Sequence, residues 1–234
     1  MHPTDKAARI AGALYLALAI TAPFHLIYIP RALIVTGNAT ATANNILAHE
    51  TLFRFGIVAD LMTSVIFICL VMALYRLFSS VNKTIASLMV ALVLVSAAVG
   101  FVNVLNYIAA LTLFRGADFL AVLEKPQRDA LAMLFLRLDG QGNVINEIFW
   151  GLWLLPFGLL VMRSRFLPRI LGVWLIINGF AYLIMSFTGL VLPQYEDMVS
   201  NIAFPALLGE MAFMLWVLIK GAKLDSAALS PAAG

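Results

Sequence analysis

Three acidic residues, Asp60, Glu147 and Glu210, stand within long apolar stretches of this 234-residue sequence. A carboxylate in hydrocarbon is costly unless other groups compensate it, and ionisable residues in membrane segments generally serve binding or proton transfer. Desolvation favours the uncharged form of a carboxylic acid, so such a group can exchange protons with a solute. The chemistry to expect from these residues is therefore cation binding, proton exchange or general acid–base catalysis.

Other polar side chains fall at similar depths in their own apolar stretches. His25, Asp60 and Glu147 each lie 16 residues from a basic residue that marks the same end of their stretches. At 1.5 Å per residue, all three are about 24 Å from one membrane boundary. Polar residues grouped at one depth should face the interior of a helix bundle. The predicted pocket is lined by His25, Arg54, Asp60, Asn103, Asn106, Asn146 and Glu147, with Asn178 and Glu210 at its floor.

Several of these residues also fit simpler roles. Glu50 and Arg54 are four residues apart, a spacing that favours a surface ion pair on one helix. His25 equally fits a histidine at the membrane interface, and Asn178 fits a hydrogen bond between helices. The three acids could also form a purely structural network, so the pattern alone leaves both interpretations open.

The composition is that of a membrane protein. Hydrophobic residues make up 63% of the chain and charged residues only 12%, whereas a soluble domain carries about 25% charged residues. No basic patch interleaved with aromatic residues occurs, which argues against nucleic-acid binding. Cys69 is the one cysteine and is predicted to be a small buried hydrophobic residue. No close-spaced pair of metal ligands such as H-E-x-x-H occurs, so neither a metal nor another cofactor is predicted.

Six apolar segments are long enough to cross about 30 Å of hydrocarbon, which predicts an all-α, polytopic membrane fold. They are residues 7–29, 51–75, 85–114, 143–162, 168–192 and 199–219. Nine of the fifteen basic residues fall in short segments on one side of these spans, and acids accompany most of those on the other side. The positive-inside rule then predicts that both termini are cytoplasmic.

The segments outside the spans differ in character. Residues 36–45, TGNATATANN, are small and polar and predict a mobile loop. Around residues 118–138, apolar residues recur at i, i+3, i+4 and i+7 after Pro126, which predicts an amphipathic helix on the outer membrane surface. We expect one six-span membrane domain over residues 1–224, followed by a disordered cytoplasmic tail over 225–234.

The stretch FWGLWLLPFGLLVMRSRFLPRILGVWLIINGFAYLI, Phe149 to Ile184, resembles a bacterial membrane-protein family known as domain of unknown function 4386. Three other stretches share the resemblance: AGALYLALAI near the start, RFGIVADLM at 54–62 and GEMAFMLWVLIKG at 209–221. The resemblance covers roughly residues 7–223. It implies a multi-pass protein of the bacterial cytoplasmic membrane and brings no assigned catalytic or binding residues.

These observations favour an outward-facing polar pocket that binds or translocates a small polar or cationic solute, alone or coupled to proton exchange. One alternative is an intramembrane enzyme acting on a lipid or quinone-like substrate, with Asp60 or Glu147 as general acid or base and Arg54 holding an anionic head group. Another is a structural or partner-binding subunit. The expected partners are the lipid bilayer and a small polar solute or lipid, and the sequence leaves the oligomeric state open.

Overall fold

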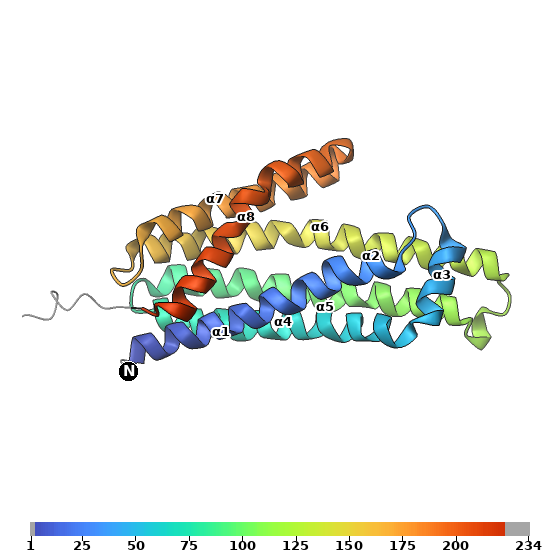
Figure 1. Ribbon diagram of the computed structural model, residues 1–234, viewed down its shortest axis with the longest axis horizontal. Helices are drawn as coiled ribbons and strands as arrows, with labels where there is room; N and C mark the ends of the chain where they lie inside the picture. The colour runs from blue at the N-terminus through green and yellow to red at the C-terminus, as the bar shows by residue number, and fades with distance from the viewer. Residues whose placement is uncertain (1–2, 223–234) are drawn as a thin grey trace, which may run out of the picture. The chain divides into compact units, whose positions relative to one another are not determined.

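The computed structural model describes residues 3–222, in which every regular element is a helix (Figure 1). The predicted all-α fold is therefore confirmed. In chain order the elements are α1 (Pro3–Pro23), the π-helix η1 (Phe24–Tyr28), α2 (Ile29–Leu33), α3 (Ala39–Ala48), α4 (Glu50–Phe78), α5 (Lys83–Arg115), the 3-10 turn η2 (Asp118–Leu120), α6 (Lys125–Arg163), α7 (Arg169–Val191), the 3-10 turn η3 (Pro193–Tyr195) and α8 (Glu196–Ile219).

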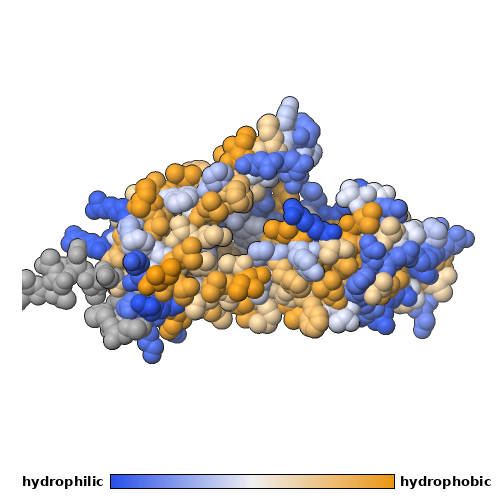
Figure 2. Space-filling model, viewed as in Figure 1, coloured by the Kyte–Doolittle hydropathy of each residue, from blue (hydrophilic) through white to orange (hydrophobic). Residues whose placement is uncertain are grey.

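Six helical segments are long and apolar enough to cross a membrane, as predicted. They are Asp5–Leu33, Glu50–Phe78, Lys83–Arg115, Lys125–Arg163, Arg169–Val191 and Pro193–Ile219. Many large hydrophobic side chains on them are exposed, and hydrophobic residues, orange in Figure 2, cover much of the visible surface. Because each helix satisfies its own backbone hydrogen bonds, such segments are stable in lipid. The chain is a multi-pass membrane protein.

The chain divides into two compact units, which are described separately. Unit 1 comprises Met1–Ala17, Phe67–Ser96 and Glu147–Gly234, and unit 2 comprises Leu18–Ile66 and Ala97–Asn146. Helices α1, α4, α5 and α6 contribute residues to both units. The single six-span domain expected over residues 1–224 stays a prediction, and the tail expected over 225–234 lies outside the described residues.

Unit 1 has an aromatic core. The rings of Trp153 and Phe157 on α6 are stacked with centroids 5.1 Å apart, and Phe157 meets Phe213 of α8 edge-on at 4.7 Å. Helices α7 and α8 lie side by side (Figure 1). Gly158 of α6 and Gly172 of α7 allow a close approach of these two helices, because a Cβ atom on Gly158 would lie 2.6 Å from the carbonyl oxygen of Gly172.

Unit 2 contains helix α3, where a mobile loop was predicted for residues 36–45. Asn38 has an extended backbone and caps the helix, since its side-chain oxygen accepts a hydrogen bond from the N–H of Ala41 at 2.9 Å. Thr42, at 0% exposure, also bonds the backbone of Val35. The loop prediction was wrong because small polar residues serve as well in a capped helix as in a loop.

The segment around 118–138 is helical from Lys125 onward, but it is continuous with the fourth span. Helix α6 runs without a break from Lys125 to Arg163, and Pro126 occupies its second position. Gly140 and Gly142 do not interrupt it, because an isolated glycine costs an α-helix only about 1 kcal/mol. The prediction of a separate surface helix was therefore wrong, because this segment forms the first turns of a long spanning helix.

The prediction that Cys69 is buried was also wrong, since this residue is exposed on α4.

Candidate functional site

In unit 2, His25 and Asp60 form a buried pair between the first and second spans. His25 belongs to the π-helix η1, where the N–H of Ile29 bonds the carbonyl of Phe24. Pro30 has no N–H to bond the helix behind it, which favours such an irregular turn, and π-turns often occur at functional sites. The exposed fractions of His25 and Asp60 are 5% and 6%, and Nδ1 lies 3.7 Å from Oδ2. This distance is too long for a hydrogen bond, and it allows an ion pair when the imidazole is protonated.

A second buried contact in unit 2 joins α5 to α6. The side-chain amide of Asn103 donates to the backbone carbonyl of Asp139 at 2.9 Å and to its carboxylate at 3.2 Å. Asn143, one turn further along α6, donates to the other carboxylate oxygen of Asp139 at 3.3 Å. Asn106 donates to Asn103 at 3.1 Å. The Asp139 carboxylate is therefore solvated by amides in place of water.

Tyr107 connects these two contacts. Its hydroxyl hydrogen-bonds Asp139, and Asp60 lies close enough to act electrostatically on both Tyr107 and Asp139. Four helical segments thus supply one group of polar side chains with two carboxylates and one imidazole. We call this group the His25 cluster, and it consists of His25, Asp60, Asn103, Asn106, Tyr107, Asp139 and Asn143.

The Nε2 atom of His25 is buried and has no hydrogen-bond partner among the described residues. A buried polar atom left without a partner is destabilising, so native proteins rarely retain one without a reason. The other ring nitrogen faces Asp60. The imidazole therefore has one side directed at a carboxylate and one side available to a proton donor or to a ligand.

Small residues allow the helices of unit 2 to approach. A Cβ atom at Gly142 of α6 would overlap the side-chain amide of Asn103, so glycine is needed at this position. A Cβ atom at Gly100 would lie 2.8 Å from the hydroxyl oxygen of Ser64 and 4.0 Å from Nδ2 of Asn146. The close packing of α4, α5 and α6 is what brings polar groups from separate helices within bonding distance.

Unit 1 contains a second polar group around Glu210 of α8. The hydroxyl of Tyr15 donates to Oε1 of Glu210 at 2.5 Å, and Asn178 of α7 donates to Oε2 at 3.3 Å. Tyr182, one turn from Asn178, also hydrogen-bonds Glu210. Asn178 is fully buried and its Oδ1 has no partner among the described residues. We call Tyr15, Asn178, Tyr182 and Glu210 the Glu210 cluster.

Comparison with known proteins identifies the family. The profile of the family described as Domain of unknown function (DUF4386) matches residues 10–221. The chain belongs to the DUF4386 family. It is similar to an uncharacterized protein of Archaeoglobus fulgidus, with 27% identity over 177 residues, which cover 76% of this chain and 90% of that protein. No solved structure matches the chain.

The structure of this DUF4386 protein distributes the nine predicted pocket residues over both units. His25, Arg54, Asp60, Asn103, Asn106 and Asn146 are in unit 2, and Glu147, Asn178 and Glu210 are in unit 1. Contacts join His25 to Asp60, Asn103 to Asn106, and Asn178 to Glu210. A single pocket formed by all nine residues stays a prediction.

Two of the predicted residues have other surroundings. Arg54 is exposed and its Nε lies 2.7 Å from Glu50, so the predicted surface ion pair is confirmed. Arg115 lies 3.6 Å from the same carboxylate. The Arg54 guanidinium is therefore engaged at the surface and is no member of the His25 cluster. Glu147 is half-buried and acts electrostatically on Tyr182 within unit 1.

Five members of the two clusters in this DUF4386 protein were not among the predicted pocket residues: Tyr15, Tyr107, Asp139, Asn143 and Tyr182. Asp139 was expected outside the spans, among the acids on the side opposite the nine basic residues, yet its exposed fraction is 4%. Asn143, Asn146 and Glu147 form a polar stripe on α6. Asp139 lies four residues before Asn143 and continues this stripe, which could have identified it. Tyr15 and Tyr182 carried no signal, because tyrosines in apolar helices are common. Within residues 3–222, no group of three or more His, Cys, Asp or Glu side chains is placed to hold a metal ion.

Proposed function

We propose that this DUF4386 protein binds or translocates a small polar or cationic solute, coupled to proton exchange at the His25 cluster. One observation carries the proposal: two buried carboxylates and an imidazole from separate spans gather in unit 2, and one imidazole nitrogen has no partner. Ionisable groups in spans are expensive and are retained chiefly where they act on ions, protons or substrates.

The charges of the cluster favour a cation. Asp60 and Asp139 supply two potential negative charges, and no lysine or arginine belongs to the cluster. Two carboxylates that interact in a medium of low dielectric disfavour each other's ionisation unless a positive charge compensates them. A bound cation or a proton provides that charge. The amides of Asn103 and Asn143 hold one carboxylate in a fixed orientation.

His25 suits the exchange of a proton for the solute. A proton on the imidazole would be stabilised by Asp60, 3.7 Å away, and binding of a cation at the carboxylates would favour release of that proton by electrostatic repulsion. The π-turn that carries His25 gives the first span a local irregularity beside the site, and such irregularity is typical of transport sites in membrane helices.

The proposal extends to membrane and orientation. We place the protein in the bacterial cytoplasmic membrane with both termini in the cytoplasm, because nine of its fifteen basic residues lie in short segments on that side. With this orientation His25 and Asp60 lie in the outer half of the bilayer, and we expect the solute site at the His25 cluster to open outward. Accessibility of cysteines introduced at Asn82 and Gly116 to a membrane-impermeant thiol reagent tests the orientation, with Cys69 replaced by serine.

Thermal unfolding of the purified protein with added cations tests the binding site. We expect guanidinium, ethylammonium or Na⁺ to raise the melting temperature of the wild type, because a ligand that binds only the folded state stabilises it. The double variant Asp60→Asn/Asp139→Asn should lose this shift. Asp118→Asn removes an exposed carboxylate and should retain it. An equal shift in the double variant would refute the assignment of the His25 cluster as the cation site.

A structural role is the second candidate, because Asp139 and Glu210 each have several hydrogen-bond donors already. Fully satisfied polar networks rigidify a protein without any ligand. This hypothesis predicts that Asp139→Asn lowers the melting temperature. It also predicts that proton uptake by reconstituted vesicles, measured with an enclosed pH-sensitive dye, is the same with and without the carboxylates of Asp60 and Asp139.

A further inference from the structure

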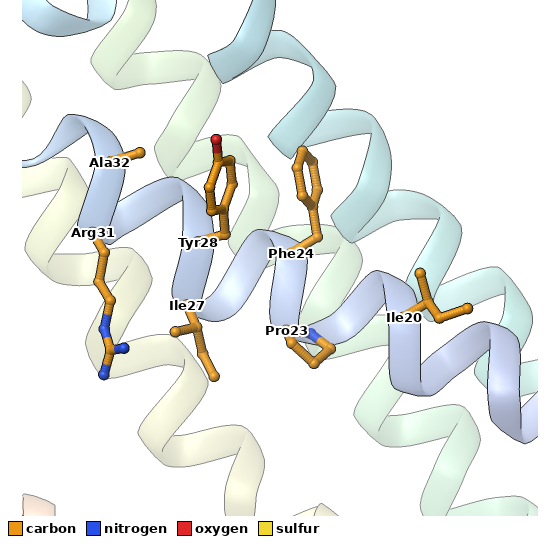
Figure 3. Close-up of a pocket in the computed structure, with 7 residues that line it drawn as sticks. All are labelled: Ile20, Pro23, Phe24, Ile27, Tyr28, Arg31 and Ala32. Atoms are coloured by element: carbon orange, nitrogen blue, oxygen red, sulfur yellow. The ribbon is translucent and has the colours of Figure 1, made fainter.

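An open hollow lies along the first span in unit 2. It has a volume of about 540 Å³ and is lined by Ile20, Pro23, Phe24, Ile27, Tyr28, Arg31 and Ala32 (Figure 3). Phe24 and Tyr28 project to one side of the helix, and Ile27 and Arg31 to the other (Figure 3). The two rows follow the i, i+4 ridges of a helix, between which a groove runs. We call this feature the α1–α2 groove.

The α1–α2 groove is separate from the His25 cluster. Successive residues of a helix are rotated by 100° about its axis. The two rows of residues that line the groove are therefore centred on the face of the helix opposite to His25 and Ile29. His25 and Ile29 are buried, whereas Ile20, Ile27 and Tyr28 have exposed fractions of 64%, 48% and 52%. The hollow is therefore a feature of the exposed face and plays no part in the proposed solute site.

The charge in the groove lies at one end. Arg31 is exposed, two residues before the end of α2, and its guanidinium has no ion pair or hydrogen bond among residues 3–222. The rest of the lining is apolar except for the hydroxyl of Tyr28. Arginine near the end of a span, with tyrosine beside it, is typical of the level of lipid head groups.

The length of the groove matches one leaflet. Ile20 and Arg31 are 11 residues apart, which corresponds to about 16 Å at 1.5 Å per residue. Half of a hydrocarbon core of about 30 Å is about 15 Å. An amphiphile with its anionic head on Arg31 would therefore place an acyl chain along Ile27, Phe24 and Ile20. The stacked rings of Phe24 and Tyr28, 5.5 Å apart, form a rigid wall for that chain.

We propose that the α1–α2 groove is a binding site for an anionic phospholipid, with the phosphate on Arg31 and one acyl chain in the apolar hollow. Charge complementarity selects the anionic class, because a zwitterionic lipid brings a positive group beside the guanidinium. Basic residues between or beside spans recognise anionic head groups in this way. The bound lipid would cover the exposed hydrophobic residues of the first span.

Native mass spectrometry of the full chain tests the site, with phosphatidylglycerol and phosphatidylcholine of identical acyl chains as probes. We expect the wild type to bind one phosphatidylglycerol about fivefold more tightly than phosphatidylcholine, the effect of one arginine near a charged surface. Arg31→Gln should abolish this preference. Arg137→Gln removes another exposed arginine of unit 2 that also has no ion pair among the described residues, and should leave the preference intact.

Two further measurements separate the contribution of the lipid head group to binding from that of the acyl chain. Ile27→Trp fills the groove and should weaken phosphatidylglycerol binding, while glycerol 3-phosphate, which has no acyl chain, should not compete. The proposal is overturned if Arg31→Gln keeps the wild-type preference, or if Arg137→Gln loses it equally. It is also overturned if the wild type has no preference, or if glycerol 3-phosphate displaces the lipid.

Discussion

Replacement of Gly142 by alanine tests how helix packing supports the His25 cluster. A Cβ atom at Gly142 would lie 2.5 Å from Cγ and 2.9 Å from Nδ2 of Asn103. Because real contacts of this kind are longer, the Asn103 side chain must turn away in Gly142→Ala. It would then lose its bonds to the Asp139 carbonyl, at 2.9 Å, and to the Asp139 carboxylate, at 3.2 Å.

The size of the effect follows from these contacts. The bond to the carbonyl contributes about 1 kcal/mol and the bond to the carboxylate about 2 kcal/mol. Replacing a glycine within a helix by alanine gains about 1 kcal/mol. We therefore expect Gly142→Ala to lower the free energy of unfolding by about 2 kcal/mol. Gly140→Ala, two residues earlier on α6, meets nothing within 4 Å and should raise it by about 1 kcal/mol.

Reversible unfolding by SDS in mixed micelles measures these differences. The decisive comparison uses an Asn103→Ala background, in which the obstructing side chain is absent. There, Gly142→Ala should stabilise the protein as much as Gly140→Ala does. The reasoning is refuted if Gly142→Ala remains destabilising in that background, or if it stabilises the otherwise unmodified protein.

Three further substitutions test other contacts by the same SDS titration. Tyr15→Phe removes the hydroxyl that donates to Glu210 at 2.5 Å and should cost about 2 kcal/mol; an equal cost in a Glu210→Ala background would contradict this contact. Gly172→Ala puts a Cβ atom 2.6 Å from the carbonyl oxygen of Gly158, so α6 and α7 must separate, at a cost of about 1–3 kcal/mol; unchanged stability would argue against close packing. Asn38→Ala removes the cap of α3 and should cost about 1 kcal/mol and speed amide exchange in its first turn, whereas Asn38→Asp should preserve both.

The spans were predictable because lipid imposes a simple rule on sequence. A segment that crosses the bilayer needs about 20 apolar residues. Five of the six predicted segments fall within spanning helices, and the segment 168–192 extends one residue beyond each end of Arg169–Val191. The ends of the helices were less predictable. Hydropathy falls where a helix leaves the hydrocarbon, but the helix itself continues, as α6 does on the Lys125 side of the fourth span. A small polar segment gives no hydropathy signal, so α3 was mistaken for a loop.

The site was predictable only in part, for a related reason. A polar residue in an apolar helix indicates that a compensating partner exists, and for Asp60 and Glu210 such partners are present. Which partner it is depends on the rotation of each helix and on how closely the helices pack. Asp139 meets Asn103 because Gly142 admits the asparagine between α5 and α6. No property of Asp139 alone could reveal this.

By itself, the sequence determined that the chain is a membrane protein with six spanning helices and that its spans contain carboxylates needing compensation, because these properties depend on hydropathy along one chain. Only the tertiary structure decided that Asp60 faces His25, that Asp139 is buried, and that Tyr15 donates to Glu210. Contacts between helices are set by side-chain packing in three dimensions, which the periodicity of a single helix does not encode.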